Sequence, residues 1–311
     1  MARNVLLAAA LVAALSAASP TWAAGTDAVH ASTESHAEMT IFQAVVLGVV
    51  EGVTEYLPVS STGHLCLAER LLGFSAEDKA AADAYAICIQ AGAILAVVWL
   101  YFARLRTMVF GLIGRDPVGR RLAVNLVVAF LPAALMGLTF EKTIKHHLFG
   151  LWPITLAWFA GGVLILAFST RGRRSLREGF SLESLSWQRA GLIGLMQCLA
   201  MWPGTSRSLV TILGGLLAGM GLSAAVEFSF LLGLITLGAA TSYEMLQHGG
   251  AILTAFGWGG PLLGLIVAFV SAILAVRWMV TYLSRHGLAL FGYYRIALAV
   301  IVYLFILRKA P

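Results

Sequence analysis

The chain has 311 residues, of which 59% are hydrophobic and only 12% are charged, and its mean hydropathy is +0.87. Soluble globular domains carry about 25% charged residues, so a soluble enzyme is excluded and a polytopic membrane protein is indicated. The net charge of +6 comes from Lys and Arg gathered in a few loops, so it reports membrane topology and not a nucleic-acid partner. Cys66, Cys88 and Cys198 lie in or beside apolar segments and are expected to be small core residues.

The N-terminal segment has the order of a secretory signal peptide. Arg3 precedes an apolar run over 5–15, and small residues follow through Ala23 and Ala24. The apolar run is too short to span a bilayer. Residues 1–24 are therefore predicted to be a signal peptide, and residues 25–39 a polar tail outside the cytoplasm.

Two apolar units are each interrupted by a proline. The first covers 41–72 and is broken at Pro58, and the second covers 190–221 and is broken at Pro203 and Gly204. The residue before a proline is pushed out of the α region, and non-helical backbone at membrane depth is tolerated only where protein or a water-filled cavity satisfies it. Each unit is predicted to be a re-entrant hairpin of two half-helices around a polar tip.

Six further apolar segments are long enough, or nearly so, to cross a bilayer as helices. They cover 84–102, 122–140, 154–169, 228–246, 261–280 and 290–307. The predicted fold class is therefore an all-α integral membrane protein.

Loop arginines predict how these segments are oriented. The connections after the first and third spans are rich in arginine, whereas the connection over 247–260 has no Lys or Arg. Because cytoplasmic loops carry an excess of Lys and Arg, each half should hold one hairpin and three spans, with the second half inverted. The repeats would cover 40–170 and 190–311, joined by a cytoplasmic loop over 171–189, and a polar site is expected where their broken helices meet.

The tip of the first hairpin carries candidate catalytic groups. Glu51 and Glu55 are four residues apart and share one helix face, and ionisable groups inside a membrane segment are expensive and functional by default. Both carboxylates are candidate metal ligands. Ser61 is the candidate nucleophile, activated by His64. Ser60, or His64 itself, remains an alternative nucleophile.

The tip of the second hairpin is a candidate phosphate site. Arg207 needs an anionic partner in its apolar segment, and Ser206, Ser208 and Thr211 add hydroxyls at the start of the following helix. The carboxylates of the first tip would repel an anion unless a divalent cation lies between them. Carboxylate oxygens suit Mg²⁺ or Ca²⁺. Together the two tips predict phosphoryl transfer on a substrate whose body lies in membrane lipid.

The motifs at the two tips resemble those of one protein family. Glu-Gly-Val-Thr-Glu-Tyr-Leu-Pro-Val-Ser-Ser-Thr-Gly-His over 51–64 and Pro-Gly-Thr-Ser-Arg-Ser-Leu-Val-Thr over 203–211 are similar to motifs of the undecaprenyl-diphosphatases, also called bacitracin-resistance proteins. The resemblance covers about 40–307, with Leu209 at a position where glycine is usual. It implies an inverted-repeat membrane hydrolase that depends on a divalent metal.

The resemblance also implies a substrate and a location. The enzyme would remove the terminal phosphate of undecaprenyl diphosphate at the outer side of the bacterial cytoplasmic membrane, and so regenerate the lipid carrier of peptidoglycan synthesis. Residue by residue, it assigns Glu51 and Glu55 to the acidic pair and the remaining candidates to the hydroxyl–imidazole group and the phosphate motif. A homodimer is left open.

The residues distinguish this function from two others. Lipid phosphatases with the Ser-Arg-x5-His-x3-Asp motif are excluded, because Leu213 and Leu217 stand at the His and Asp positions. A polyprenyl-phosphate flippase or transporter on the same inverted-repeat scaffold is the alternative. Hydrolysis is favoured over it, because transport alone needs no nucleophile beside the acids.

Overall fold

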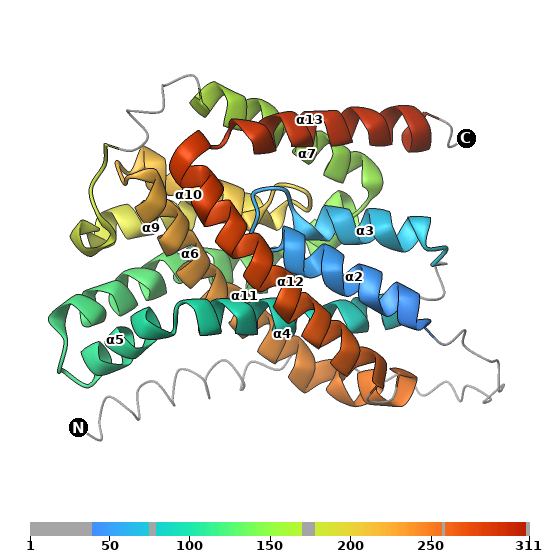
Figure 1. The fold of residues 1–311 in the computed structure, drawn as a ribbon, viewed down its shortest axis with the longest axis horizontal. Helices are drawn as coiled ribbons and strands as arrows, with labels where there is room; N and C mark the ends of the chain where they lie inside the picture. Colours follow the sequence, from blue (N-terminus) through green and yellow to red (C-terminus); the bar gives the residue numbers. More distant parts are fainter. Residues whose placement is uncertain (1–38, 75–78, 170–177, 257–258, 309–311) are drawn as a thin grey trace. The chain divides into compact units, whose positions relative to one another are not determined.

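The computed structural model describes residues 39–74, 79–169, 178–256 and 259–308. The predicted signal peptide, and the predicted tail except Met39, lie outside the described residues. Every regular element in the described ranges is a helix, and the pairing outside helices is a single bridge between Phe180 and Met220 (Figure 1). The predicted all-α fold is confirmed.

The first hairpin consists of α2 (Ile41–Thr54) and α3 (Ser61–Leu71). Thr40 begins α2 with a capping box to Gln43. The Gln43 side chain also donates to the Leu72 carbonyl over 3.3 Å. The start and the end of the unit therefore lie side by side, as a re-entrant hairpin requires, and Pro58 lies in the turn between the helices.

The second hairpin consists of α9 (Trp187–Gln197), the short helix η2 (Cys198–Met201) and α10 (Arg207–Leu217). Phe180 closes its base, donating from its N–H to the Gly219 carbonyl (3.1 Å) and accepting at its carbonyl from the Gly221 N–H (3.2 Å). The first helix starts before the predicted residue 190, because the Ser186 side chain caps it by accepting from the Arg189 N–H.

Six helices in the described ranges are long and apolar enough to cross a membrane, which is the number predicted. They are α4 (Lys79–Leu100), α6 (Pro117–Leu148), α7 (Leu151–Ser169), α11 (Leu222–Phe256), α12 (Gly259–His286) and α13 (Ala289–Val302), the last continued by η3 (Tyr303–Leu307). The chain is therefore a multi-pass membrane protein.

Two predicted loops are helical instead. The connection after the first span contains α5 (Phe102–Leu112), and α11 runs through most of the predicted 247–260 loop to Phe256. Hydropathy marks where a run of apolar residues ends, but a helix continues until a capping or breaking residue stops it. The helix α6 likewise begins before the predicted residue 122, because Asp116 caps it and Pro117 occupies its first position.

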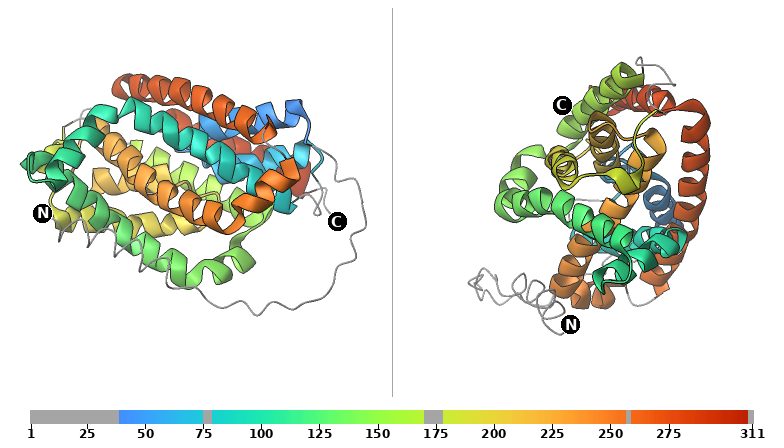
Figure 2. Two further views of the ribbon diagram at one scale, coloured as in Figure 1. Left: turned by 90° about the horizontal axis from the view of Figure 1, so that it is seen from below. Right: turned by 90° about the vertical axis from the view of Figure 1, so that its left-hand side faces the viewer.

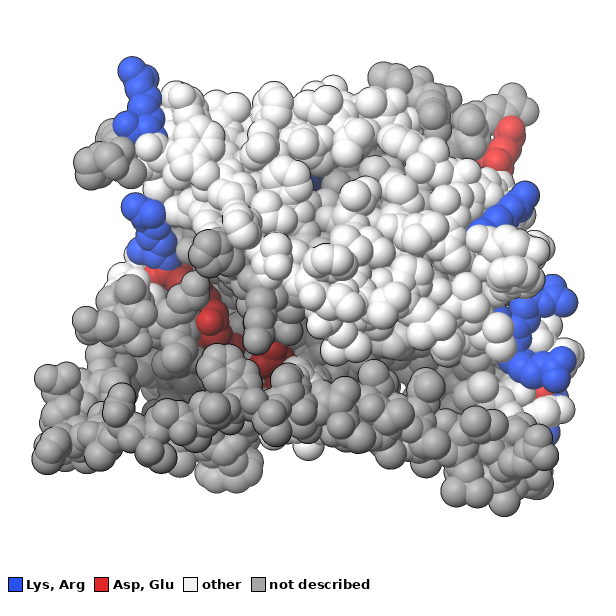
Figure 3. All heavy atoms as spheres, turned by 180° about the vertical axis from the view of Figure 1, so that it is seen from behind, with Lys and Arg blue, Asp and Glu red and all other residues white. Residues whose placement is uncertain are grey.

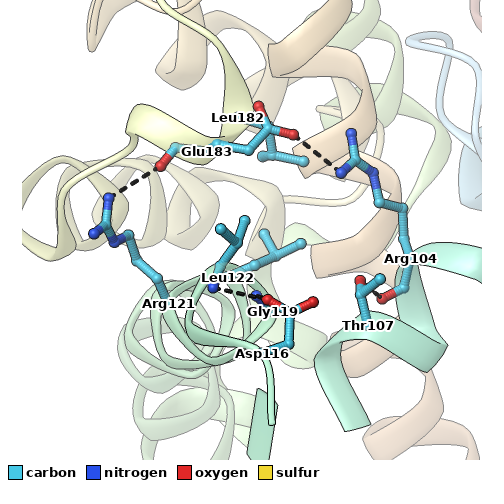
Figure 4. Close-up of a pocket in the computed structure, with 9 residues that line it drawn as sticks. Arg104, Thr107, Asp116, Gly119, Arg121, Leu122, Leu182 and Glu183 are labelled. Carbon is cyan, nitrogen blue, oxygen red and sulfur yellow. Dashed lines mark hydrogen bonds and ion pairs between the residues drawn. The ribbon is translucent and has the colours of Figure 1, made fainter. Parts of the chain in front are cut away.

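The two arginine-rich connections lie next to each other. Arg104 of α5 forms a 3.0 Å ion pair with Glu183, which precedes α9, and Arg121 donates to the Glu183 carbonyl over 3.3 Å (Figure 4). Both connections are therefore on the same side of the protein, as the positive-inside pattern requires. On the face in Figure 3, Lys and Arg lie at the two ends and a broad uncharged surface separates them.

The two hairpins reach the centre from opposite ends, as Figures 1 and 2 show. Their tips share an unusual backbone: Ser60 (φ 73°) and Ser206 (φ 75°) are the described non-glycine residues with positive φ. Each serine accepts a hydrogen bond from the N–H three residues later. Glu51 and Gln197 each precede their serine by nine positions. These correspondences support the predicted inverted repeat, which stays a prediction.

Close packing of α2 on α12 depends on Gly52. A Cβ there would collide with the Ala268 carbonyl and lie 2.9 Å from the Ala272 nitrogen. Gly52→Ala is expected to lower the free energy of unfolding by about 1–3 kcal/mol, since backbone atoms cannot move aside cheaply. Thermal unfolding in detergent measures this. Gly137→Ala in α6, where a Cβ meets nothing within 4 Å, is the control, and an equal effect of both substitutions would contradict the packing argument.

Candidate active site

A cavity of about 190 Å³ lies between the two hairpin tips. Its polar lining comes from both tips and from the spans α4 and α11. The polar lining residues are Glu55, Ser60, Ser61, Thr62, Gln90, Gln197, Ser206, Arg207 and Thr236. Five of the nine predicted site residues therefore face one cavity, although the two tips are about 150 residues apart in the sequence.

Glu55 connects the two tips. The Ser61 hydroxyl donates to Glu55 Oε2, and Arg207 Nη2 donates to Glu55 Oε1 over 3.2 Å. Both partners are buried or nearly so. A carboxylate next to the hydroxyl can accept its proton, and the neighbouring guanidinium can bind a phosphate oxygen.

Arg207 is held in place by groups outside the cavity. Its Nη1 donates to the Ser229 carbonyl over 2.9 Å, and its guanidinium lies over the Tyr56 ring, 5.3 Å from the centroid. Gly233 of α11 leaves room for it, because a Cβ there would collide with Nη1 and lie 2.6 Å from Nη2. In the part of the chain that the structure describes, the buried Nε has no hydrogen-bond partner. Arg207 is therefore fixed from outside the cavity that it lines.

Ser206, Ser208 and Thr211 have different positions. The Ser206 and Ser208 hydroxyls are 3.0 Å apart, and Ser208 donates to the Leu57 carbonyl of the first tip over 2.8 Å. Thr211 donates to the Arg207 carbonyl over 2.8 Å. Ser206 lines the cavity, whereas Ser208 and Thr211 are fully buried beside it. Ser208 and Thr211 thus make their hydrogen bonds within and between the two tips, and their contact with a phosphate stays a prediction.

His64 does not point towards Ser61. Its Nδ1 is 2.7 Å from the Ser60 carbonyl, and its Nε2 is 2.7 Å from the Tyr294 hydroxyl. A carbonyl only accepts, so Nδ1 carries the proton and Nε2 of the neutral ring accepts from Tyr294. The ring also stacks on Tyr294 and meets Trp158 edge to face. The carboxylate that accepts from Ser61 is therefore that of Glu55. Residues of α7 and α13 hold the His64 imidazole elsewhere, and its role as the base stays a prediction.

The cavity residues lie in a part of the chain that is similar to a known protein family. A family model described as "Bacitracin resistance protein BacA" matches residues 44–301. The chain belongs to this family. The matched range includes both hairpin tips and all of the cavity residues.

Curated BacA-like relatives cover most of the chain. A protein of Sorangium cellulosum named undecaprenyl-diphosphatase is 49% identical over 263 residues, which are 84% of this chain and 85% of the relative. Undecaprenyl-diphosphatase 2 of Rhodospirillum rubrum is 46% identical, over 84% of this chain and 93% of its own length. Undecaprenyl-diphosphatase of Nitrosomonas europaea is 45% identical, over 86% and 94%.

The predicted metal ligands of this BacA-family chain differ in their surroundings. Glu51 is buried and does not line the cavity, and its Oε2 has no hydrogen-bond partner among the described residues. Both oxygens of Glu55 are already bound, by Ser61 and Arg207. In the part of the chain that the structure describes, no three His, Cys, Asp or Glu side chains converge on one point. Two carboxylates would need further ligands from substrate phosphates and water, which Mg²⁺ commonly uses, so the cation stays a prediction.

Uncharged polar side chains form one wall of the cavity. Gln90 of α4 accepts from the Thr241 hydroxyl over 2.7 Å, and the Gln197 and Thr236 side chains are 3.3 Å apart. None of these side chains is among the nine predicted site residues. An amide within an apolar span is the signal that marks Gln90, since buried amides need partners.

A second pocket, of about 210 Å³, lies at the arginine-rich side (Figure 4). Its charged groups already have partners: Arg104 binds Glu183 and Glu227, and Asp116 accepts from the N–H groups of Val118 and Gly119. Hydrogen bonds, first from its own backbone N–H and then from Ser181 and Arg104, lower the pKa of the Glu183 carboxyl. The pocket therefore lies where α5, α6 and the start of the second hairpin meet, and its ion pairs hold these segments together.

Proposed function

We propose that this chain hydrolyses undecaprenyl diphosphate to undecaprenyl phosphate and inorganic phosphate. The observation that carries the proposal is the Ser61–Glu55–Arg207 chain of hydrogen bonds in the cavity between the tips. It combines a hydroxyl, a base and a phosphate clamp. The family and the names of the relatives support the same activity.

In the first step, the Ser61 oxygen attacks the terminal phosphorus while its proton passes to Glu55. The bond from that phosphorus to the bridging oxygen breaks, and undecaprenyl phosphate leaves as the anion. Arg207 neutralises charge on the transferred phosphoryl group. The alternatives, Ser60 and His64, are less suited, because the Ser60 hydroxyl caps α3 and both nitrogens of His64 are engaged elsewhere.

In the second step, water attacks the phosphoserine. Glu55, after losing its proton to bulk water, accepts a proton from the attacking water. The bond between phosphorus and the Ser61 oxygen breaks while Glu55 passes this proton to that oxygen, which restores the Ser61 hydroxyl and the Glu55 carboxylate. Inorganic phosphate is released. The Ser206 hydroxyl lines the same cavity as Arg207 and can donate to a phosphate oxygen in both steps.

Glu51 and Glu55 are the residues that would hold a divalent cation, Mg²⁺ or Ca²⁺. Such an ion would shield the negative charge of the diphosphate from the two carboxylates. The unpartnered Oε2 of Glu51 supports this assignment.

The proposed location is the bacterial cytoplasmic membrane, with the active site open to the outer side. Support comes from the arginine-rich connections, which lie together and would be cytoplasmic, and from the first hairpin, which approaches from the opposite end (Figure 1). In that setting the enzyme recycles the lipid carrier for peptidoglycan synthesis and confers bacitracin resistance. The proposed partners are the lipid substrate and the surrounding lipid.

Purified protein in detergent is expected to release phosphate from undecaprenyl diphosphate, and a chelator is expected to reduce the rate by at least about 100-fold, since a metal supplies several kcal/mol of charge stabilisation. Added Mg²⁺ or Ca²⁺ should restore it. A colorimetric phosphate assay measures both effects. Unchanged hydrolysis in excess chelator would contradict the cation assignment.

The alternative function is tested on the same preparation. A flippase would move polyprenyl phosphate across vesicle membranes without releasing phosphate. Folded protein that releases no phosphate, but moves the lipid in a headgroup-dependent manner, would overturn the proposed hydrolysis.

A further inference from the structure

Arg295 is a fully buried arginine in the middle of α13, with 0% of its surface exposed. It takes part in no ion pair among the described residues, and each of its hydrogen bonds goes to a backbone carbonyl. The acceptors are Pro58 (3.2 Å), Gly204 (2.9 Å), Ala157 (2.8 Å) and Trp158 (3.3 Å). A buried charge costs free energy unless it is well hydrogen-bonded, and here four backbone carbonyls supply the hydrogen bonds.

Two of these carbonyls belong to the two hairpin tips. Pro58 lies two residues before Ser60, and Gly204 lies two residues before Ser206. Arg295 therefore binds equivalent positions, each two residues before a serine with positive φ. One guanidinium joins the tip that carries the nucleophile to the tip that carries the phosphate clamp.

The surroundings of Arg295 are shaped to hold the guanidinium. A Cβ on Gly161 of α7 would collide with its Nη2 and lie 2.8 Å from its Cζ. The remaining two acceptors, Ala157 and Trp158, belong to the same helix, and the Trp158 indole in turn donates to the Val59 carbonyl over 3.0 Å. The side chain is thus fixed against α7 and reaches both tips from there.

We propose that Arg295 is a positioning residue that sets the distance between Ser61 and Arg207. It does not line the cavity, so it acts through the backbone of the tips and not on the substrate. The planar fork of an arginine binds carbonyls of two separate segments at once, which a lysine ammonium cannot do in the same geometry. The inference rests on the proposed hydrolysis, since it concerns the geometry of that reaction.

The test compares Arg295→Lys and Gly161→Ala with wild type in detergent. The second variant keeps the arginine but displaces its guanidinium. Both are expected to lower kcat by about 10- to 100-fold per folded molecule, while KM changes less than about threefold, because misplaced catalytic groups lose rate more than binding. Arg277→Lys, an exposed arginine stacked on Trp99, is the control and should match wild type.

A second measurement does not depend on activity. Spin labels at Val53 of α2 and Leu195 of α9, exposed positions on the two hairpins, report the distance between the hairpins once Cys66, Cys88 and Cys198 are replaced by serine. The distance distribution is expected to broaden in Arg295→Lys and Gly161→Ala.

Unchanged kcat and an unchanged distance distribution in a folded variant would overturn the positioning role. If Arg295→Lys does not fold, Gly161→Ala decides. If wild-type protein itself releases no phosphate, the proposed hydrolysis fails, and the distance measurement alone decides whether Arg295 joins the tips.

Discussion

Ser61→Ala is expected to lower phosphate release from undecaprenyl diphosphate by roughly 10³-fold or more, because the substitution removes the oxygen that forms the covalent intermediate. The hydroxyl donates to Glu55 at the cavity wall, so its loss leaves binding groups such as Arg207 in place. The variant should therefore still bind substrate. Single-turnover phosphate release measures the loss of rate, and trapping of labelled phosphate on the wild-type protein measures the intermediate.

Ser60→Ala is the matched control for this substitution. The Ser60 hydroxyl accepts from the Gly63 N–H, and loss of a helix cap costs about 0.5–2 kcal/mol of stability. We expect a lower unfolding temperature and only a moderate loss of rate. The reverse result, an active Ser61→Ala and an inactive but folded Ser60→Ala, would move the nucleophile to Ser60.

The features that could be predicted from the sequence are broken helices and charged side chains, because both cost free energy inside a membrane. Pro58 and Pro203 marked the broken helices, because helix interruption at membrane depth needs compensation. Glu55 and Arg207 stood out as charges in apolar segments, and the structure joins them directly. That they would meet each other could be proposed only because loop arginines predicted hairpins entering from opposite sides.

The partners of side chains could not be predicted in the same way. His64 is three residues from Ser61 in the sequence, yet its ring is held by Tyr294, which is 230 residues away. Nor did the position of Arg295 show that its acceptors would be the carbonyls of Pro58 and Gly204. Backbone carbonyls carry no signature in the sequence, so contacts of this kind depend on how the helices pack.

Arg207→Lys is expected to reduce kcat by about 100-fold or more, since one fork of donors binds both Glu55 and the Ser229 carbonyl and an ammonium cannot keep both bonds. Its positive charge is retained, so the loss reports geometry rather than charge. Phosphate release at saturating substrate is the measurement. Activity within threefold of wild type would exclude Arg207 as the phosphate clamp.

Two substitutions in α11, Gly233→Ala and Gly238→Ala, are controls for this prediction. In α11, Gly233→Ala would push the guanidinium away from Glu55, whereas Gly238→Ala meets nothing within 4 Å, so only the first should lower kcat.

Glu55→Gln combined with Arg207→Ala should be little slower than either change alone, because residues that act as a unit are not additive. Fully additive losses would mean that Glu55 and Arg207 act separately, and that their ion pair only holds the two hairpin tips together.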